Sequence, residues 1–306
     1  MRCAAVDIGT NTVLLLVAER DASGALVAIE ERATITRLGQ GVDRTGVLAP
    51  EAVARTIACL LGYASVARGL GVDRTGVVGT SAMRDAGGGE EVRAAVLRAF
   101  GVDARVLSGD EEARLTFLGA ISGLEVDTSS ELAVFDIGGG STEVVLGVPS
   151  PSLTIRFARS FDVGSVRLTE RFVRSDPPST ADRAAVDRFT REAIASVPPL
   201  PAGATPIGIA GTMTTLAAVS LAMPVYDGAR VHGSLLTRTD IGAVVDRLAS
   251  VDLETRRTVT GMEPKRADVI VAGASIALAM LDHWGASAAR ISDRGVRWGL
   301  AAELAG

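Results

Sequence analysis

Short runs of apolar residues, separated by small polar turns, open the chain. They cover residues 3–8, 13–17 and 26–29, and the turns between them contain glycine, asparagine, aspartate and serine. Runs of this length bounded by such residues are typical of β-strands joined as hairpins. Apolar positions then recur with helical spacing over residues 50–67, and Pro50 stands where a helix favours proline. The pattern therefore predicts a hairpin sheet followed by a long helix.

Further short apolar runs alternate with helical segments. Residues 76–79 and 104–107 each precede a segment with helical spacing, and residues 206–210 lead into a helix that ends near residue 223. This rhythm predicts parallel strands joined by right-handed crossovers. Thr212 is predicted to cap the helix after residue 210, and a last helix is expected over residues 296–304.

The opening pattern occurs twice. Residues 132–147 repeat the order of residues 4–17: an apolar strand, Asp-Ile-Gly, a small polar turn and a second apolar strand. Asp136 therefore corresponds to Asp7. We expect an α/β protein with two similarly built domains, residues 1–125 and 126–306, divided in the polar stretch 125–130. The C-terminal helix is expected either to stay with the second domain or to pack back on the first.

Three glycine-rich turns follow predicted strands, at residues 7–12, 136–142 and 208–212. Glycine lets backbone N–H groups converge on an anion because no Cβ stands in the way. Serine and threonine hydroxyls add donors, and an aspartate at a strand end is suited to a divalent cation. One such turn is more often only a turn. Two related turns with matched aspartates predict a phosphate site.

Composition and charge narrow the class of protein. The 306 residues include 47% hydrophobic and 22% charged residues, which suits a globular α/β protein, and only two cysteines. No stretch reads as a signal peptide or a membrane span, so we expect a cytoplasmic protein that does not bind membranes. The formal net charge of −5 argues against non-specific binding of nucleic-acid polymers. A polyanionic substrate must then be held by local arginines, backbone amides and metal ions.

The segment 107–115 carries three consecutive acids. Ser108 is a good helix N-cap, and Glu111 at the third helical position completes a capping box. Asp110 and Glu112 also favour the positive end of the helix dipole. From the physics alone, a purely structural role for these acids stays open.

A more specific signal is the pairing of this segment with the second glycine turn. Ser-Gly-Asp-Glu-Glu-Ala-Arg at 108–114 is followed about twenty residues later by Asp-Ile-Gly-Gly-Gly-Ser-Thr-Glu. This combination resembles the exopolyphosphatase and guanosine pentaphosphate phosphohydrolase (Ppx/GppA) family. Further matching segments lie along nearly the whole chain, at residues 79–84, 164–171, 211–215, 266–270 and 292–297. The resemblance implies two duplicated actin-like (ASKHA, ribonuclease H-like) domains that hold phosphates in an interdomain cleft.

The resemblance also implies roles for single residues. Glu112 matches the family's water-activating glutamate, and Asp136 and Glu143 match acids assigned to Mg²⁺ (or Mn²⁺), with Asp7 assisting. Arg84 matches a position near the phosphates in the family. The alternative is that Arg84 only forms an ordinary surface ion pair. The three turns are expected to donate to phosphate oxygens through Thr10, Asn11, Thr12, Gly138, Gly139, Gly140, Ser141, Gly211 and Thr212.

Other polar residues carry weaker signals. The two histidines, His232 and His283, belong to no ligand pair and are predicted to be structural. A group of arginines in the second half either extends a track for a polyanion or lies on solvated helix faces. The group consists of Arg256, Arg257, Arg266, Arg294 and Arg297.

The leading functional hypothesis is an exopolyphosphatase that releases orthophosphate from inorganic polyphosphate. A rival with the same chemistry converts guanosine pentaphosphate to the tetraphosphate. An actin-like ATPase or kinase, or an alarmone-binding sensor without turnover, would belong to a different class. Longer family members carry a further C-terminal helical domain, so at 306 residues we expect a preference for short polyphosphate. The resemblance suggests a homodimer.

Overall fold

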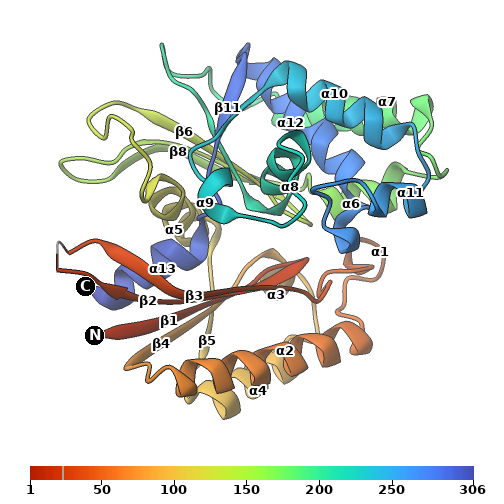
Figure 1. Ribbon diagram of the computed structural model, residues 1–306. Coiled ribbons are helices and arrows are strands. Elements are labelled where there is room, and N and C mark those ends of the chain that lie inside the picture. The colour runs from red at the N-terminus through yellow and green to blue at the C-terminus, as the bar shows by residue number, and fades with distance from the viewer. Residues whose placement is uncertain (23) are drawn as a thin grey trace. The chain divides into compact units, whose positions relative to one another are not determined.

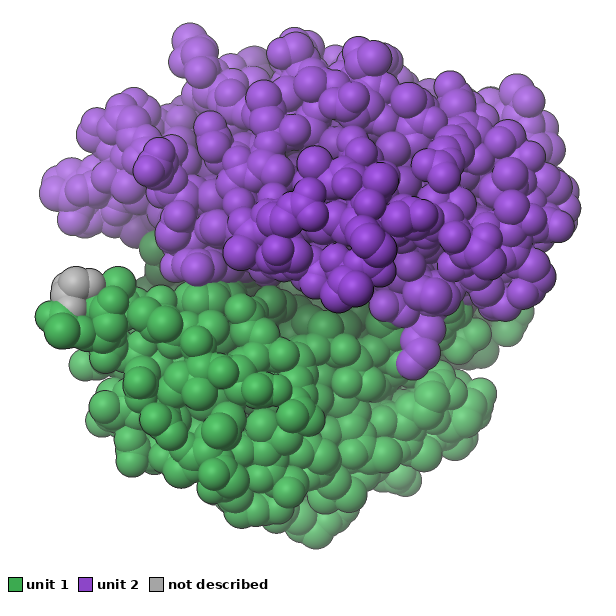
Figure 2. All heavy atoms as spheres, in the orientation of Figure 1, with its two compact units in different colours: residues 1–119, 295–306 green, residues 120–294 purple. Residues whose placement is uncertain are grey.

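The chain divides into two compact units. The computed structural model describes residues 1–22 and 24–306. Unit 1 comprises residues 1–119 and 295–306, and unit 2 comprises residues 120–294 (Figure 2). The division predicted from the sequence lay at 125/126. In the structure the chain leaves unit 1 after residue 119, and its last helix belongs to unit 1.

Unit 1 is built on a five-stranded sheet with the order β3-β2-β1-β4-β5 (Figure 1). The first three strands are antiparallel, whereas β4 pairs in parallel with both β1 and β5. The strands are β1 (Arg2–Ile8), β2 (Thr12–Arg20), β3 (Leu26–Ile35), β4 (Arg74–Gly79) and β5 (Ala104–Val106). The helices are α1 (Val42–Thr45), α2 (Pro50–Gly69), α3 (Ser81–Asp85), α4 (Glu90–Phe100), α5 (Gly109–Ile121) and α13 (Val296–Ala305).

Side chains of β1 alternate between two hydrophobic cores, one on each face of this sheet. Ala4, Val6 and Ile8 pack into a core shared with α2 and α4. Cys3 and Ala5 pack into the other core, which includes residues of α5 and α13. The alternation places Asp7 on the same face of the sheet as α5 and α13.

Unit 2 has a six-stranded sheet with the order β10-β11-β9-β6-β7-β8. Its strands are β6 (Leu132–Ile137), β7 (Thr142–Val148), β8 (Thr154–Phe161), β9 (Ile207–Ile209), β10 (Leu235–Thr237) and β11 (Ala288–Ile291). Its helices are α6 (Ser165–Phe172), α7 (Thr180–Ile194), α8 (Ala210–Ser220), α9 (Gly228–Val231), α10 (Arg238–Ala249), α11 (Leu253–Arg257), the short η1 (Pro264–Arg266) and α12 (Ile270–Trp284). The apolar helix α12 packs against α6, α7, α8 and α10 in the centre of the core.

The two sheets repeat one topology. The series β3-β2-β1-β4-β5 in unit 1 corresponds to β8-β7-β6-β9-β11 in unit 2, with the same parallel and antiparallel pairings. The additional strand β10 pairs antiparallel with β11 at the far edge. This repetition confirms the expected α/β fold of two duplicated domains.

Both boundaries of helix α8 differ from the prediction, and it ends at Ser220 and not near residue 223. Helix α8 begins at Ala210, two residues before the predicted cap, and its N-cap residue Ile209 makes no side-chain capping bond. Ala210 adopts a positive φ of 66°, so the chain turns directly from β9 into the helix. Thr212 is consequently buried inside the first turn. Across residues 1–22 and 24–306, no helix has both the length and the apolar character that crossing a membrane requires.

Candidate functional site

In unit 1 the predicted site residues follow three neighbouring parallel strands. The turn after β1 carries Asn11, helix α3 after β4 carries Arg84, and helix α5 after β5 carries Glu112. The carboxyl ends of parallel strands lie along one edge of a sheet, where α/β proteins build their sites. The topology therefore brings these three elements to the same edge, next to Asp7 at the end of β1.

The residues Arg84 and Glu112 form an ion pair. Nη1 of Arg84 lies 2.6 Å from Oε2 of Glu112 and also donates to the carbonyl oxygen of Leu107 at 3.2 Å. The Glu112 side chain is 7% exposed and the Arg84 side chain 24%. A carboxylate this buried needs a charged or hydrogen-bonding partner, because losing its hydration is costly. Arg84 forms the predicted surface ion pair as well, since its Nε lies 3.2 Å from Oδ1 of the partly exposed Asp85, but its contact with Glu112 is largely buried.

The neighbouring Glu111 has a different environment. Its Oε2 accepts hydrogen bonds from the N–H and the hydroxyl of Ser108, both at 2.9 Å, and its own N–H donates to Ser108 Oγ at 3.3 Å. This reciprocal arrangement is the predicted capping box. The hydrogen bonds from Ser108 lower the pKa of Glu111. Two adjacent acids therefore differ: exposed Glu111 closes the helix end, whereas buried Glu112 contacts Arg84.

The first glycine turn holds a buried amide donor. The N–H of Gly9 donates to the carbonyl of Thr12 at 3.1 Å, and the carbonyl of Asn11 accepts from the N–H of Thr36 at 3.1 Å. The Asn11 side chain is buried, with the residue 6% exposed, and within the described part of the chain its Nδ2 has no hydrogen-bond partner. Leaving such a donor unsatisfied is costly. A bound anion would satisfy it.

The second glycine turn repeats this arrangement in unit 2. The N–H of Gly138 donates to the carbonyl of Ser141 at 3.0 Å, as Gly9 does to Thr12 in unit 1. This N–H is therefore used inside the turn, so the predicted donation from Gly138 to a phosphate is not supported. By contrast, among the residues the structure describes, the N–H groups of Gly139 and Gly140 donate to no protein acceptor.

Asp136 and Glu143 lie directly opposite each other on the antiparallel strands β6 and β7. Side chains at such positions share one face of the sheet and lie close together. Glu143 is buried, and its Oε1 accepts a hydrogen bond from the Ser160 hydroxyl at 2.6 Å. Among residues 1–22 and 24–306, no cluster of three or more acids, histidines or cysteines has metal-ligand geometry. A carboxylate pair still fits Mg²⁺, which binds one or two carboxylates and completes its shell with water and phosphate oxygens.

The third turn places a cation at the start of α8. A Cβ on Gly211 would lie 2.1 Å from Cζ of Arg266, so the guanidinium occupies the space that any other residue would fill. Because β9 pairs in parallel with β6, with Ile209 beside Asp136, this turn lies at the same sheet edge as residues 138–141. Arg266 is thus the member of the arginine group that the fold brings to a predicted phosphate turn.

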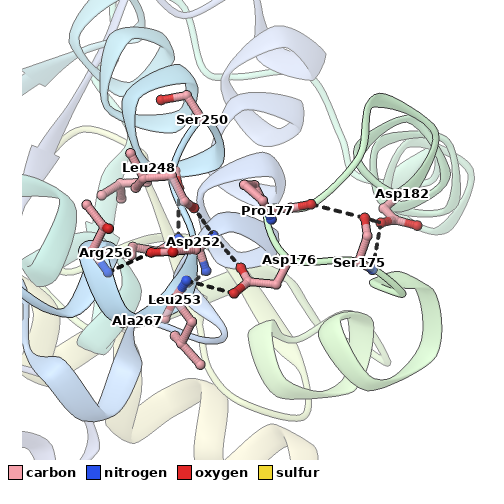
Figure 3. Close-up of polar contacts among 12 residues, drawn as sticks. Ser175, Asp176, Pro177, Asp182, Leu248, Ser250, Asp252, Leu253, Arg256 and Ala267 are labelled. Carbon is pink, nitrogen blue, oxygen red and sulfur yellow. Dashed lines mark hydrogen bonds and ion pairs between the residues drawn. The ribbon is translucent and has the colours of Figure 1, made fainter.

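The other four arginines of that group contact protein atoms away from the predicted phosphate turns. Arg256 is buried and donates to the carbonyls of Leu248 and Ala267 and to Asp176, at 2.7, 3.0 and 3.3 Å (Figure 3). Burial lowers the pKa of Arg256. The prediction that it binds a polyanion or lies on a solvated helix face was wrong, because its guanidinium ties three segments of unit 2 together. The other contacts are Arg257–Glu254, Arg294–Ser122 and Arg297–Glu31.

Both histidines are hydrogen-bonded to the protein. Nε2 of His283 lies 2.9 Å from the carbonyl of Val197, and Nδ1 of His232 lies 3.2 Å from both Ser292 Oγ and Asp293 Oδ1. These contacts agree with the structural role predicted for them.

A cation beside the second turn was missed at the sequence level. Nε of Arg167, on α6, donates to the carbonyl of Gly140 at 2.6 Å. The only sequence signal was its place inside the segment 164–171. That segment pointed to the family but not to a particular side chain.

Known proteins with similar sequences and structures agree on one family. The sequence matches the Ppx/GppA phosphatase family over residues 16–306. It is 39% identical to exopolyphosphatase 2 of Mycobacterium tuberculosis over 321 residues, covering all of this chain and 99% of that protein. The crystal structure of an exopolyphosphatase-like protein superposes with a TM-score of 0.91 at 31% identity, covering 100% of this chain and 99% of the other. The Aquifex aeolicus Ppx/GppA family member gives 0.83 at 34% identity, with coverages of 99% and 97%. The chain belongs to the Ppx/GppA phosphatase family.

Proposed function

We propose that this protein is an exopolyphosphatase that hydrolyses the terminal phosphoanhydride bond of inorganic polyphosphate and releases orthophosphate. The names of its relatives support this substrate, and family membership supports the reaction class. The observation that carries the proposal is the buried carboxylate of Glu112. It is held by Arg84 at the sheet edge where Asp7 and the first glycine turn also lie.

In this proposal Glu112 is the general base. Phosphoryl transfer passes through a loose transition state, so the protein mainly has to align water and neutralise charge. Glu112 accepts the proton of the attacking water, a role worth roughly 10²–10⁴-fold in rate. Arg84 fixes Oε2 at 2.6 Å and so orients the base. This assigns Arg84 mainly to Glu112, with neutralisation of a phosphate as a second task.

The glycine turns supply donors for the non-reacting phosphate oxygens. In unit 1 the donors are the buried Nδ2 of Asn11 with the backbone of Thr10 and the hydroxyl of Thr12. In unit 2 they are the N–H groups of Gly139, Gly140 and Ser141, and those of Gly211 and Thr212 at the start of α8. Fixed N–H donors stabilise the charge of a transferring phosphoryl group without having to reorganise.

Asp136 and Glu143 would hold Mg²⁺ or Mn²⁺. When bound, the ion supplies positive charge to the phosphate oxygens and to the leaving phosphate. The opposed positions of Asp136 and Glu143 on β6 and β7 support this assignment.

Charge supports a preference for short chains. At a formal net charge of −5 the protein gives a long polyanion no general attraction, and Arg256, Arg257 and Arg297 contact other protein groups. Binding then depends on the few terminal phosphates that contact the turns. We also propose that the protein acts as a homodimer in the cytoplasm, as the family resemblance suggests.

Phosphate release from purified protein tests the proposal. Short polyphosphate, long polyphosphate, guanosine pentaphosphate and ATP are compared at equal concentrations, with Mg²⁺ and with EDTA. We expect turnover of short polyphosphate that stops in EDTA. Preferential release from guanosine pentaphosphate would favour the second family activity, and release from ATP alone would favour an actin-like ATPase. Faster turnover of long chains would contradict the length preference.

A further inference from the structure

The carbonyl groups of the three glycines in the second glycine turn point to one set of donors, at the start of α6. The carbonyl of Gly138 accepts from the N–H of Ser165 at 2.9 Å and from its hydroxyl at 3.1 Å. The carbonyl of Gly139 accepts from the N–H groups of Val166 at 2.9 Å and Arg167 at 3.1 Å. The N–H groups at the start of α6 therefore donate to the glycine turn and not to a ligand.

The side chain of Arg167 completes this set. Its Nε donates to the carbonyl of Gly140 at 2.6 Å, and Nη2 lies 3.4 Å from Oδ1 of Asp162. The side chain is only 18% exposed. The helix and the turn are in close contact, because a Cβ on Gly164 would lie 2.3 Å from the carbonyl oxygen of Gly139. Arg167 is thus fixed against the backbone of the turn.

The geometry of the peptide bond gives these contacts a consequence. In a trans peptide the N–H group points opposite to the C=O group of the same peptide plane. Fixing the carbonyls of Gly138, Gly139 and Gly140 toward α6 directs the N–H groups of residues 139, 140 and 141 away from it. Successive N–H groups that point to one side form a concave anion-binding surface. The helix and Arg167 therefore determine which side of the turn can bind an anion.

We propose that Arg167 is a positioning residue for hydrolysis: its guanidinium holds the Gly140 carbonyl, and this aims the N–H of Ser141 at the phosphoryl group. The inference rests on the proposed function, because it assumes that residues 139–141 bind phosphate. Arg167 acts through the peptide between Gly140 and Ser141 and needs no contact with the substrate. Its contribution belongs to the transition state, in which aligned donors count most.

Four variants test the inference. Arg167→Met removes the donor and keeps the apolar stem, whereas Arg167→Gln and Arg167→Lys each retain an N–H donor that can reach the Gly140 carbonyl. Arg171→Met, one turn later on α6, makes the same charge change at an exposed residue that stacks on Phe172 and Phe189. The measurements are kcat and KM for short polyphosphate, with thermal unfolding of each variant.

Removing one fixed donor from an oxyanion site costs roughly 10²–10³-fold in kcat, so misaligning one should cost about 10-fold to 100-fold. We expect that loss in kcat for Arg167→Met, with KM changed less than about 3-fold, while Arg171→Met stays within about 2-fold of the wild type. Arg167→Gln and Arg167→Lys should recover most of the loss.

Two outcomes would overturn the inference. One is a kcat for Arg167→Met equal to that of Arg171→Met. The other is a loss in Arg167→Gln as large as in Arg167→Met, since the lost hydrogen bond would then not be the cause. If Arg167→Met does not fold, Arg167→Gln and Arg167→Lys are compared with Arg171→Met instead. The inference is then contradicted if both variants have a kcat below about a fifth of the kcat of Arg171→Met. Failure of the proposed function is distinct, because the wild type itself would then release no phosphate from polyphosphate.

Discussion

The same substitution, glutamate to glutamine, can be compared at the adjacent residues Glu111 and Glu112, which have different predicted roles. Glu112→Gln keeps the shape and one acceptor for Arg84 but removes the charge that accepts a proton. Glu111→Gln changes the net charge by the same amount, one residue earlier. Because glutamine is also found in capping boxes, this second variant retains the hydrogen bonds to Ser108.

The structure allows both effects to be estimated. Loss of a general base costs about 10²–10⁴-fold in rate, which corresponds to roughly 3–5 kcal/mol of barrier. In Glu112→Gln a 2.6 Å charge-assisted hydrogen bond becomes a neutral acceptor beside Arg84, at a cost of about 1–2 kcal/mol. Glu111→Gln loses only the favourable charge at an exposed helix start, about 0.3–1 kcal/mol.

Phosphate release, substrate binding and thermal unfolding are measured on all three proteins. We expect Glu112→Gln to lose at least 100-fold in kcat, to retain polyphosphate binding, and to unfold at a temperature lower by roughly 2–6 °C. Glu111→Gln should keep normal turnover. Its small deficit in stability should be present at neutral pH and should vanish as the pH falls through the lowered pKa of Glu111, because protonation then removes the charge from the wild type as well.

Normal turnover in Glu112→Gln would refute the assignment of the base. Equal losses in both variants would refute it in another way, because the cause would then be a disturbed helix and not a missing proton acceptor.

Three further outcomes are expected. Arg84→Met leaves the buried carboxylate of Glu112 without its cation, so the free energy of unfolding should fall by roughly 2–4 kcal/mol and kcat should also fall. Denaturant unfolding measures the first effect and phosphate release the second. Unchanged values in both would contradict the ion pair. Gly211→Ala places a Cβ where the Arg266 guanidinium lies, at the end of a flexible side chain that can shift. We expect a higher KM for polyphosphate with little change in stability, and an unaltered KM would mean that this turn does not bind substrate. Although burial acts in the opposite direction, hydrogen bonds from two serines lower the pKa of Asp182 to about 2, so its charge stabilises the fold above about pH 4. Asp182→Asn should be less stable than the wild type at pH 7 but not near pH 2. A difference in melting temperature that does not depend on pH would exclude this linkage.

Much of the fold could be predicted because its signals are local. The matched Asp-Ile-Gly strands and turns encode the duplicated hairpins, and Ser108 with Glu111 encodes the start of α5 through neighbouring residues alone. The boundary of α8 was misjudged because a positive φ at Ala210, a non-glycine residue, leaves no trace in the sequence.

The site was predicted in part, for a similar reason. The sequence indicated Glu112 and Arg84 separately, but the 2.6 Å contact joins residues 28 positions apart on different helices. Arg167 and Gly140 are 27 positions apart, and their contact depends on how closely α6 approaches the turn. The buried role of Arg256 likewise depends on three segments that come together only in the folded chain. The spacing of residues in the sequence does not predict contacts between residues this far apart in the chain.

The assignment of the last helix to unit 1 bears on the order in which the protein acquires its structure during synthesis. Unit 2 is continuous in sequence, so all of its strands and helices have been synthesised before residue 295 is added. The apolar face of β1 formed by Cys3 and Ala5, in contrast, is covered in part by α13, whose residues are synthesised after those of unit 2. A nascent chain can therefore complete unit 2 while unit 1 still exposes a hydrophobic surface, and chaperones can bind this surface until α13 emerges from the ribosome.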